Sequence, residues 1–168
     1  LKNTGVNIGK SVCDDGYKDL VEEILKKSKE HNCQIYYPLD VVVSKTLDGV
    51  GNIREIDEVN NDEMILDIGP KTITSIKDII EGTNTVLWNG PAGYFENPNF
   101  ANGTKKILEI IADKKAKNKI YAVAGGGETV AVINKFEKLE SFNFVSTAGG
   151  AFLEYLEGKE LPGIRALN

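Results

Sequence analysis

The sequence predicts an α/β domain in which helices flank a mainly parallel sheet. Strand-like and helix-like hydrophobic periodicities alternate along the chain, which is typical of repeated βα units. With 168 residues the chain has the size of one ordinary domain. Its 41% hydrophobic and 27% charged residues are the balance of a folded globular protein. We therefore expect one domain with a single hydrophobic core.

The first predicted helix follows a pair of aspartates. Asp14 or Asp15 can cap it, because short polar side chains accept hydrogen bonds from the first N–H groups of a helix. We expect one face of this helix to be buried. The apolar residues at the spacing of one face are Tyr17, Leu20, Val21, Ile24 and Leu25.

The next segment combines two strands with a long polar stretch. Residues 35–43 are predicted to form a strand that Pro38 interrupts, because proline has no N–H to donate. Residues 44–62 are polar and contain several glycines, which predicts a long surface excursion with room for a short hairpin. Residues 64–68 form the second predicted strand.

The second half of the chain repeats strand and helix more regularly. Residues 72–81 predict a short helix, and residues 85–88 a third strand that is apolar on both faces, as a central parallel strand should be. Asn97 and Pro98 are predicted to open a long helix, since Asn is a good N-cap and Pro suits the first helical position. Its buried stripe comprises Phe100, Ile107, Leu108 and Ile111. The remaining elements are strands at 119–124 and 143–146 and helices at 129–136 and 150–156.

Charge and composition argue against several classes of function. A formal net charge of −5 gives no electrostatic footprint for nucleic acid. Two cysteines and one histidine, His31, indicate no zinc site, disulfide framework or Ser-His or Cys-His pair. No apolar run approaches the roughly 20 residues of a membrane span. We therefore expect a cytoplasmic protein without a membrane partner.

The chain begins at Leu1 with no initiator Met, which we interpret as the start of a fragment or a processed terminus.

Four predicted strands end in glycine-containing turns that lead towards helices. In open α/β sheets ligands bind outside the carboxyl ends of the strands. We therefore expect the four turns to lie side by side and to form the site. They are Gly69-Pro70, Asn89-Gly90-Pro91, Gly125-Gly126-Gly127 and Ala148-Gly149-Gly150.

The segment from Gly125 to Thr129 is the most informative of these turns. Its glycines let the backbone approach a ligand, and the amides at the start of the following helix can donate to phosphate oxygens. The pattern predicts an anion site, although a tight turn can also use glycine for its geometry alone. Neither a G-x-x-x-x-G-K-[ST] nor a G-x-G-x-x-G motif occurs, which argues against a P-loop and against NAD binding.

Glu128 has two interpretations. A carboxylate in the first turn of a helix is favourable for the helix dipole alone. Beside bound phosphates, however, a carboxylate would repel them unless a Mg²⁺ lies between the two. A phosphate site together with Glu128 therefore indicates a metal-nucleotide complex.

Five segments, taken in order and spacing, resemble phosphoglycerate kinases. The resemblance as a whole extends over nearly the whole chain, from about residue 8 to residue 167. The segments are Leu66-Asp67-Ile68-Gly69-Pro70; Val86 to Pro91 with Gly93, Phe95 and Glu96; Gly125-Gly126-Gly127; Ser146 to Ala151; and Leu156 to Lys159 with Leu161-Pro162-Gly163.

The resemblance implies a Rossmann-like three-layer αβα domain with a mainly parallel sheet. Residues 1–168 would be one partial C-terminal nucleotide-binding domain that lacks the opening strands of that domain. The family enzyme has two domains and transfers a phosphoryl group between 1,3-bisphosphoglycerate and Mg-ADP, giving 3-phosphoglycerate and ATP in glycolysis. The resemblance implies Mg²⁺ with ADP or ATP as substrate and no prosthetic group. It implies 3-phosphoglycerate binding only together with the N-terminal domain, so we expect the fragment alone to be inactive.

The resemblance also assigns roles to single residues. Glu96 matches the residue that binds the ribose hydroxyls, Leu66 and Pro91 match contacts of the adenine, and Asn89 matches a group near the phosphates. Gly126, Gly127, Glu128 and Thr129 match the phosphate loop. The amides of Gly127 and Gly150 match catalytic groups that stabilise the transferring phosphoryl. Glu128 stands where the family usually has Asp, so the implied metal ligand carries an extra methylene.

Two other classes of function stay open. A self-sufficient nucleotide-binding module should bring its own phosphate cation, and no turn offers one convincingly: Lys71 follows Gly69-Pro70 at a helix start, but an exposed surface lysine is the better interpretation of it. A purely structural interaction protein would leave the glycine turns unexplained. Because absent opening strands would leave a sheet edge uncovered, we also expect self-association through that edge.

Overall fold

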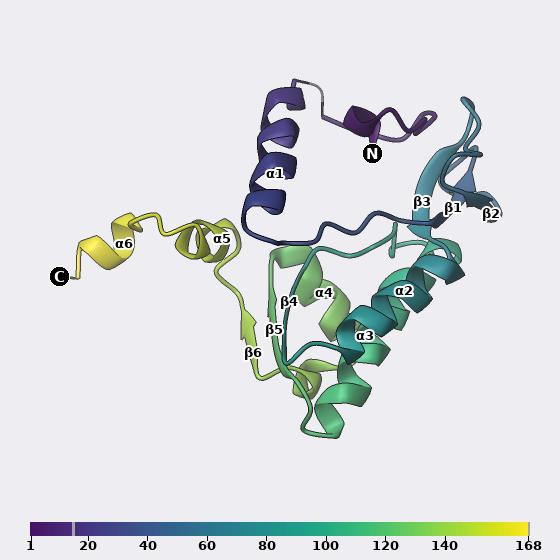
Figure 1. Ribbon diagram of the computed structural model, residues 1–168. Helices are drawn as coiled ribbons and strands as arrows, with labels where there is room; N and C mark the ends of the chain where they lie inside the picture. Colours follow the sequence, from purple (N-terminus) through teal and green to yellow (C-terminus); the bar gives the residue numbers. More distant parts are fainter. Residues whose placement is uncertain (15, 168) are drawn as a thin grey trace.

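The computed structural model of the chain describes residues 1–14 and 16–167 (Figure 1). Its described strands form two three-stranded sheets, one in the order β2-β1-β3 and one in the order β4-β5-β6. None of its described helices is both long enough and apolar enough to cross a membrane.

The first sheet is antiparallel. It comprises β1 (Asp40–Ser44), β2 (Asn52–Glu55) and β3 (Met64–Ile68), and β1 pairs antiparallel with both neighbours. The polar stretch 44–62 therefore does contain part of a short hairpin, formed by β1 and β2. The expectation of a strand over 35–43 is wrong for its first part, because the ladder begins only at Asp40. No helix connects β1 to β3, and parallel pairing needs a long crossover, usually helical, so this pair is antiparallel.

The second sheet is parallel and follows the predicted alternation of strand and helix. It comprises β4 (Thr85–Asn89), β5 (Tyr121–Gly125) and β6 (Phe144–Ser146). The prediction that residues 85–88 form a central strand is wrong within the described sheet, because β4 lies at its edge and β5 at its centre. Apolar residues on both faces of a strand do not specify which strands lie beside it.

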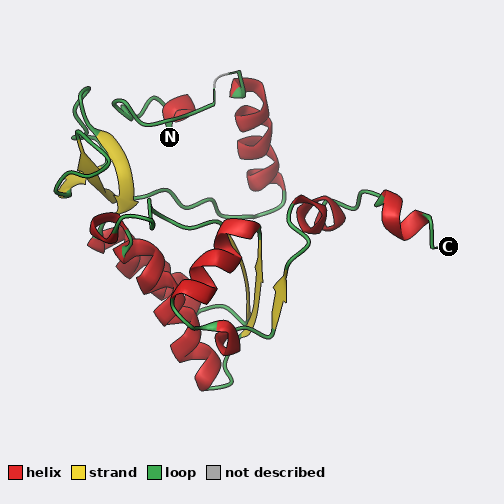
Figure 2. Ribbon diagram, turned by 180° about the vertical axis from the view of Figure 1, so that it is seen from behind, coloured by secondary structure: helices red, strands yellow, loops and turns green. Residues whose placement is uncertain are grey.

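Helices cover one face of the parallel sheet. The helices α2 (Pro70–Glu81), α3 (Asn102–Ala116) and α4 (Gly127–Lys135) share one hydrophobic core with Trp88, Ala122 and Ala124. The Trp88 ring stacks on Phe142 with 6.1 Å between ring centroids. Figures 1 and 2 show these helices on one side of the strands and α5 (Gly150–Leu156) on the other side. The predicted layers of helix, sheet and helix are therefore confirmed.

The other face of the parallel sheet is largely open. Leu87, Val123 and Phe144 lie side by side in the strand register, on the side away from the core. Leu87 is 44% exposed and Phe144 is 54% exposed. We call this face, with Tyr121 from the start of β5, the open face.

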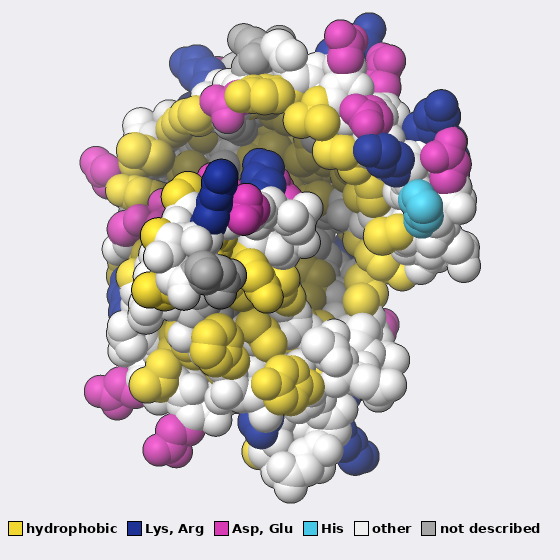
Figure 3. All heavy atoms as spheres, turned by 90° about the vertical axis from the view of Figure 1, so that its left-hand side faces the viewer, with side chains coloured by type: hydrophobic (Ala, Val, Ile, Leu, Met, Phe, Trp, Pro, Cys, Tyr) yellow, Lys and Arg dark blue, Asp and Glu magenta, His cyan; other side chains and the backbone are white. Residues whose placement is uncertain are grey.

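The first helix differs from its prediction in both its cap and its burial. Helix α1 (Lys18–Glu30) has Tyr17 at its N-cap and no side-chain cap hydrogen bond, so the prediction of Asp14 as cap is wrong. Asp15, the alternative cap, lies outside the described residues. The helix contains no buried residue, and its apolar face borders a hollow lined by hydrophobic side chains (Figure 3).

The helix expected to begin at Asn97 begins later. Asn97 caps a short 3₁₀ turn, η2 (Pro98–Phe100), by accepting a hydrogen bond of 2.9 Å from the Asn99 N–H. Helix α3 then starts at Asn102 and buries Ile107, Leu108 and Ile111 as predicted. Three further short helices were not predicted: η1 (Lys2–Thr4), η3 (Leu139–Ser141) and α6 (Pro162–Arg165).

Candidate functional site

Three of the four predicted glycine turns lie at the carboxyl edge of the parallel sheet. Asn89, Gly125 and Ser146 end neighbouring strands in register, so the turns that follow them are adjacent. The fourth turn, Gly69-Pro70, follows β3 in the antiparallel sheet, so the expectation that the four turns lie side by side along one sheet edge is wrong for this one. The three adjacent turns are the candidate site.

The turn between β5 and α4 requires glycine at Gly126. Its φ angle is +92°, which L-amino acids with a side chain rarely adopt. A Cβ at this position would also lie only 2.6 Å from Asn89 Oδ1, so the turns after β4 and β5 are in contact. Gly127 begins α4 with open space around it, and both Gly127 and Glu128 are exposed. The first N–H groups of a helix have no acceptor within that helix, so this end of α4 can receive an anion.

Thr129 is fully buried and connects two turns. Its Oγ1 accepts a hydrogen bond of 2.6 Å from the Gly90 N–H, and its exposed fraction is 0%. The side chain of this predicted nucleotide-binding residue therefore holds the turn after β4 against the first turn of α4.

The loop after β4 carries the residues expected to contact the nucleoside. The Tyr94 N–H donates to the Leu66 carbonyl of β3 over 2.7 Å, which places Leu66 beside the loop that contains Pro91 and Glu96. Leu66 and Pro91 are half-buried and Glu96 is exposed. The structure therefore brings Leu66 of β3 to the loop that carries the other two residues.

A buried acid that was not assigned a role fixes the next helix. The Asp67 carboxylate accepts hydrogen bonds of 2.8 Å from the Ile68 and Gly103 N–H groups and so anchors the first turn of α3. Burial raises the pKa of this carboxyl above its ordinary value, and these hydrogen bonds act in the opposite direction. An acid inside an otherwise apolar strand was the sequence signal for this anchor.

Asp40 does the same for α2, with the opposite shift of its pKa. Its carboxylate accepts hydrogen bonds from the Lys71 N–H at 3.0 Å and from the Thr72 N–H and Oγ1, both at 2.8 Å. Burial acts to raise the pKa of Asp40, but the hydrogen bonds from Lys71 and Thr72 outweigh it and lower the pKa. The Lys71 ammonium, the one candidate phosphate cation, lies beside the Glu55 carboxylate.

The turn after β6 reaches the same edge of the sheet through Phe152 of α5. The Phe152 ring lies against the Gly125 backbone, where a Cβ would be only 2.3 Å from it. Gly150 begins α5 and, like Gly127, has open space around it. The two predicted catalytic glycines therefore begin helices that follow neighbouring strands.

Glu128 has no cluster of metal ligands around it. Across residues 1–14 and 16–167, no three His, Cys, Asp or Glu side chains are grouped so that they could hold a metal ion. A Mg²⁺ near Glu128 would therefore need phosphate oxygens and water as its other ligands, which is the usual way in which Mg²⁺ accompanies a nucleotide.

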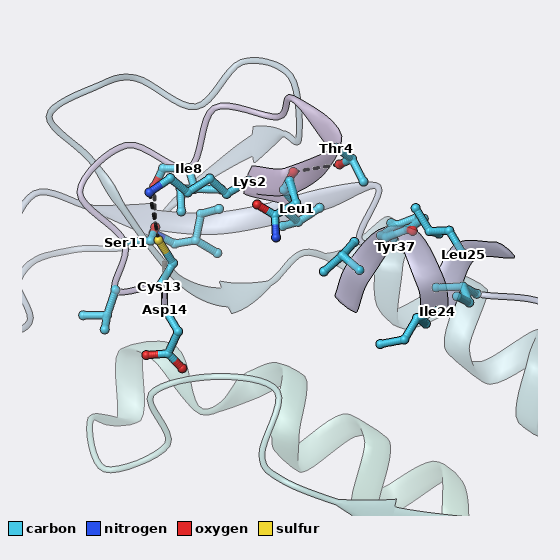
Figure 4. Close-up of a pocket in the computed structure, with 15 residues that line it drawn as sticks. Leu1, Lys2, Thr4, Ile8, Ser11, Cys13, Asp14, Ile24, Leu25 and Tyr37 are labelled. Atoms are coloured by element: carbon cyan, nitrogen blue, oxygen red, sulfur yellow. Dashed lines mark hydrogen bonds between the residues drawn. The ribbon is translucent and has the colours of Figure 1, made fainter. Parts of the chain in front are cut away.

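The hollow beside α1 is separate from this site. It measures about 520 Å³ and lies between the N-terminal segment, α1 and β3 (Figure 4). Its walls include Ile8, Ile24, Leu25 and Tyr37, and the Lys2 ammonium donates to Cys13 Sγ at 3.4 Å beside it. No predicted site residue is among the described residues that line it.

Comparisons with known proteins point to one family. The model of a family described as phosphoglycerate kinase matches residues 1–159. The chain is 44% identical to the phosphoglycerate kinase of Azorhizobium caulinodans, over 99% of this chain and 43% of that protein. It is 45% identical to that of Francisella philomiragia, over 99% of this chain and 42% of that protein. The chain thus spans less than half the length of the curated relatives it matches.

Solved structures agree with this result. The fold matches the phosphoglycerate kinase of Coxiella burnetii with a TM-score of 0.90 and 39% identity, over 100% of this chain and 43% of that chain. It matches that of Pyrococcus horikoshii with a TM-score of 0.72 and 28% identity, over 99% of this chain and 41% of that chain.

Proposed function

The chain belongs to the phosphoglycerate kinase family, and on this premise we propose that it is the part of such a kinase that binds Mg-ADP or Mg-ATP. The whole enzyme would transfer a phosphoryl group between 1,3-bisphosphoglycerate and Mg-ADP, giving 3-phosphoglycerate and ATP in glycolysis. The observation that carries the proposal is the alignment of three glycine turns at one edge of the parallel sheet, with the start of α4 open to a ligand.

The phosphates would lie at the start of α4. The amides of residues 126–128 are the donors nearest the open end of the helix, and the helix dipole favours negative charge there. Asn89 would complete this side of the site, since its Oδ1 already borders Gly126. Thr129 would contribute its main-chain N–H, because its Oγ1 is bound by Gly90.

The nucleoside would extend towards β3. Leu66 and Pro91 offer half-buried apolar surface for the adenine, and the exposed Glu96 carboxylate offers an acceptor for the ribose hydroxyls. The contact between Tyr94 and Leu66 supports this arrangement, because it holds both sides of that surface together.

Catalysis would come from main-chain amides rather than from an acid or base. Phosphoryl transfer depends chiefly on positioning and on stabilising the charge of the moving group. The amides of Gly127 and Gly150 begin helices after adjacent strands and would supply such stabilisation. The second substrate would be held by the other domain of the family enzyme, so we propose that this chain alone binds nucleotide without turnover.

Calorimetric titration with ADP, with Mg²⁺ and with chelator, tests the metal-nucleotide assignment. We expect Glu128→Gln to weaken ADP binding in Mg²⁺ by roughly three- to tenfold and to strengthen it in chelator, where the carboxylate only repels phosphate. Glu128→Asp, which restores the usual residue of the family, should bind Mg-ADP more tightly than the wild type. Glu140→Gln removes an exposed carboxylate elsewhere and serves as the matched control.

The outcomes separate three cases. Tighter ADP binding by Glu128→Gln both in Mg²⁺ and in chelator would mean that Glu128 is not a metal ligand and serves only as a charge at the start of the helix. Wild-type protein that binds no ADP at all, or that is stabilised by NAD alone, would overturn the nucleotide assignment itself. Turnover by the purified chain, free of any full-length enzyme, would overturn the proposal that it is inactive alone.

A further inference from the structure

The loop from Gly90 to Asn97 is fixed at several points by neighbouring elements. Near its start, Thr129 Oγ1 accepts from the Gly90 N–H. In its middle, Thr104 Oγ1 of α3 accepts from the Ala92 N–H at 3.0 Å and from the Gly93 N–H at 3.2 Å. The Phe95 carbonyl near its end accepts a hydrogen bond of 2.8 Å from the Lys135 ammonium.

Lys135 makes two contacts with the same residue of this loop. Besides the hydrogen bond to the carbonyl, its Nζ lies 5.4 Å from the centroid of the Phe95 ring, within the range of a cation–π interaction. The Phe95 ring itself belongs to the hydrophobic core. The position of Phe95 is therefore set from both its main chain and its side chain, and Glu96 follows it directly in the chain.

Both ends of the loop are consequently attached to one helix. Thr129 lies in the first turn of α4 and holds Gly90, and Lys135 is the last residue of α4 and holds Phe95. The nine residues of α4 span about 12 Å. Because a helix of this length is rigid, it fixes the distance between the turn at Gly126 and the end of the loop that bears Glu96.

We infer that Lys135 is a positioning residue that sets Glu96 at the right distance from the phosphate turn, and that it thereby favours a whole nucleotide over a bare diphosphate. This inference rests on the proposed function, since it assumes phosphates at the start of α4 and a ribose at Glu96. Lys135 would not touch the nucleotide. A lysine at a helix C-terminus also interacts favourably with the helix dipole, so the test must distinguish positioning from a gain in stability alone.

The test compares binding of ADP and of pyrophosphate, both with Mg²⁺, by calorimetry. Lys135→Met keeps the apolar stem and removes the ammonium, and we expect it to weaken ADP binding by about five- to tenfold while pyrophosphate binding changes less than about twofold. Lys135→Arg, which retains a donor and a charge, should keep most of the ADP affinity. Lys138→Met, which removes an exposed ammonium three residues further on, is the matched control and should leave the affinity for both ligands unchanged.

Hydrogen exchange of the peptide covering residues 89–97, without ligand, is the second measurement. We expect faster exchange in Lys135→Met than in Lys138→Met, with the two variants melting within a few degrees of each other. Equal losses for ADP and pyrophosphate, or unchanged exchange in the loop, would overturn the positioning role. If the wild-type protein binds neither ligand, the proposed function itself is wrong. If Lys135→Met binds ADP as tightly as the wild type does, only the inference about Lys135 is wrong.

Discussion

The two faces of the parallel sheet differ sharply, although the strands supply apolar residues to both. On the covered face, Trp88, Ala122 and Ala124 are buried beneath α2, α3 and α4. On the open face, Leu87, Tyr121 and Phe144 are each between 44% and 54% exposed. Covered and open residues alternate along the same strands.

This difference indicates which side of the sheet contributes most to the stability of the folded chain. Apolar area removed from water contributes about 25 cal/mol per Å², so the covered face and its helices supply most of the hydrophobic free energy of folding. The open face contributes little of that free energy, and it leaves a surface that favours association. Large exposed apolar patches usually mark such interaction surfaces.

The largest expected effect is a contrast in stability between the two sides. Ile111 in α3 is fully buried in the core behind the covered face, so Ile111→Ala should lower the free energy of unfolding by about 2 to 5 kcal/mol. Leu87→Ala on the open face should cost less than about 1 kcal/mol, because Leu87 already contacts water. Urea unfolding monitored by the fluorescence of Trp88 measures both variants. Similar losses for the two variants would mean that the open face is covered in solution.

The second prediction concerns self-association. We expect the chain to form larger species with rising concentration, through the open face and the sheet edges beside it. Phe144→Glu should weaken this association by about 10- to 100-fold, the effect of losing one buried aromatic side chain. Sedimentation over a range of concentrations measures it, with Ala131→Glu on α4 as the control for the added charge. A wild type that stays monomeric at high concentration would contradict the prediction.

The smallest expected effect distinguishes the two acids that anchor the covering helices. The pKa of Asp40 is lowered in the folded protein, so its stabilisation is present above its ordinary pKa of 3.8 and is lost as the pH falls. The pKa of Asp67 is raised, so its contribution is present at low pH and is lost as the pH rises from 3.8 through the raised pKa. The stability penalties of Asp40→Asn and Asp67→Asn should therefore change with pH in opposite directions.

Urea unfolding between about pH 3 and pH 7 checks this pair. We expect Asp40→Asn to cost about 1 to 3 kcal/mol at pH 7 and progressively less towards pH 3. The cost of Asp67→Asn should be greatest at low pH and should shrink towards pH 7. Asp78→Asn, an exposed change in α2, provides the baseline. Parallel curves for the two buried acids would show that they titrate alike and that the opposite shifts are wrong.

The accuracy of the sequence predictions also differs between the two halves of the molecule. From Thr85 to Leu156 the strands and helices follow the predicted order within a few residues, because each strand is short, apolar and bounded by glycine or a helix cap. The helix expected at Asn97 starts later, at Asn102, because an N-cap signal does not distinguish a 3₁₀ turn from an α-helix. The helix expected at 129–136 starts earlier, at Gly127, because helix ends are poorly defined by periodicity. Before residue 85 the predictions were less accurate. Residues 35–39 are not part of a strand, and β1 pairs antiparallel with β3. Hydrophobic periodicity does not show where a ladder begins or in which direction two strands pair.

The sequence by itself determined the class of the protein, the family it resembles and the positions of its glycine turns, because these depend on residue types at fixed local spacings. Only the tertiary structure decided which residues meet across long separations. It placed Thr129 against Gly90 and Lys135 against Phe95, and it buried Asp40 and Asp67 at the starts of two helices. It also decided that one face of the parallel sheet is covered and the other is open. Each of these contacts joins segments that are far apart in the chain, and local patterns carry no information about which distant segment will pack where.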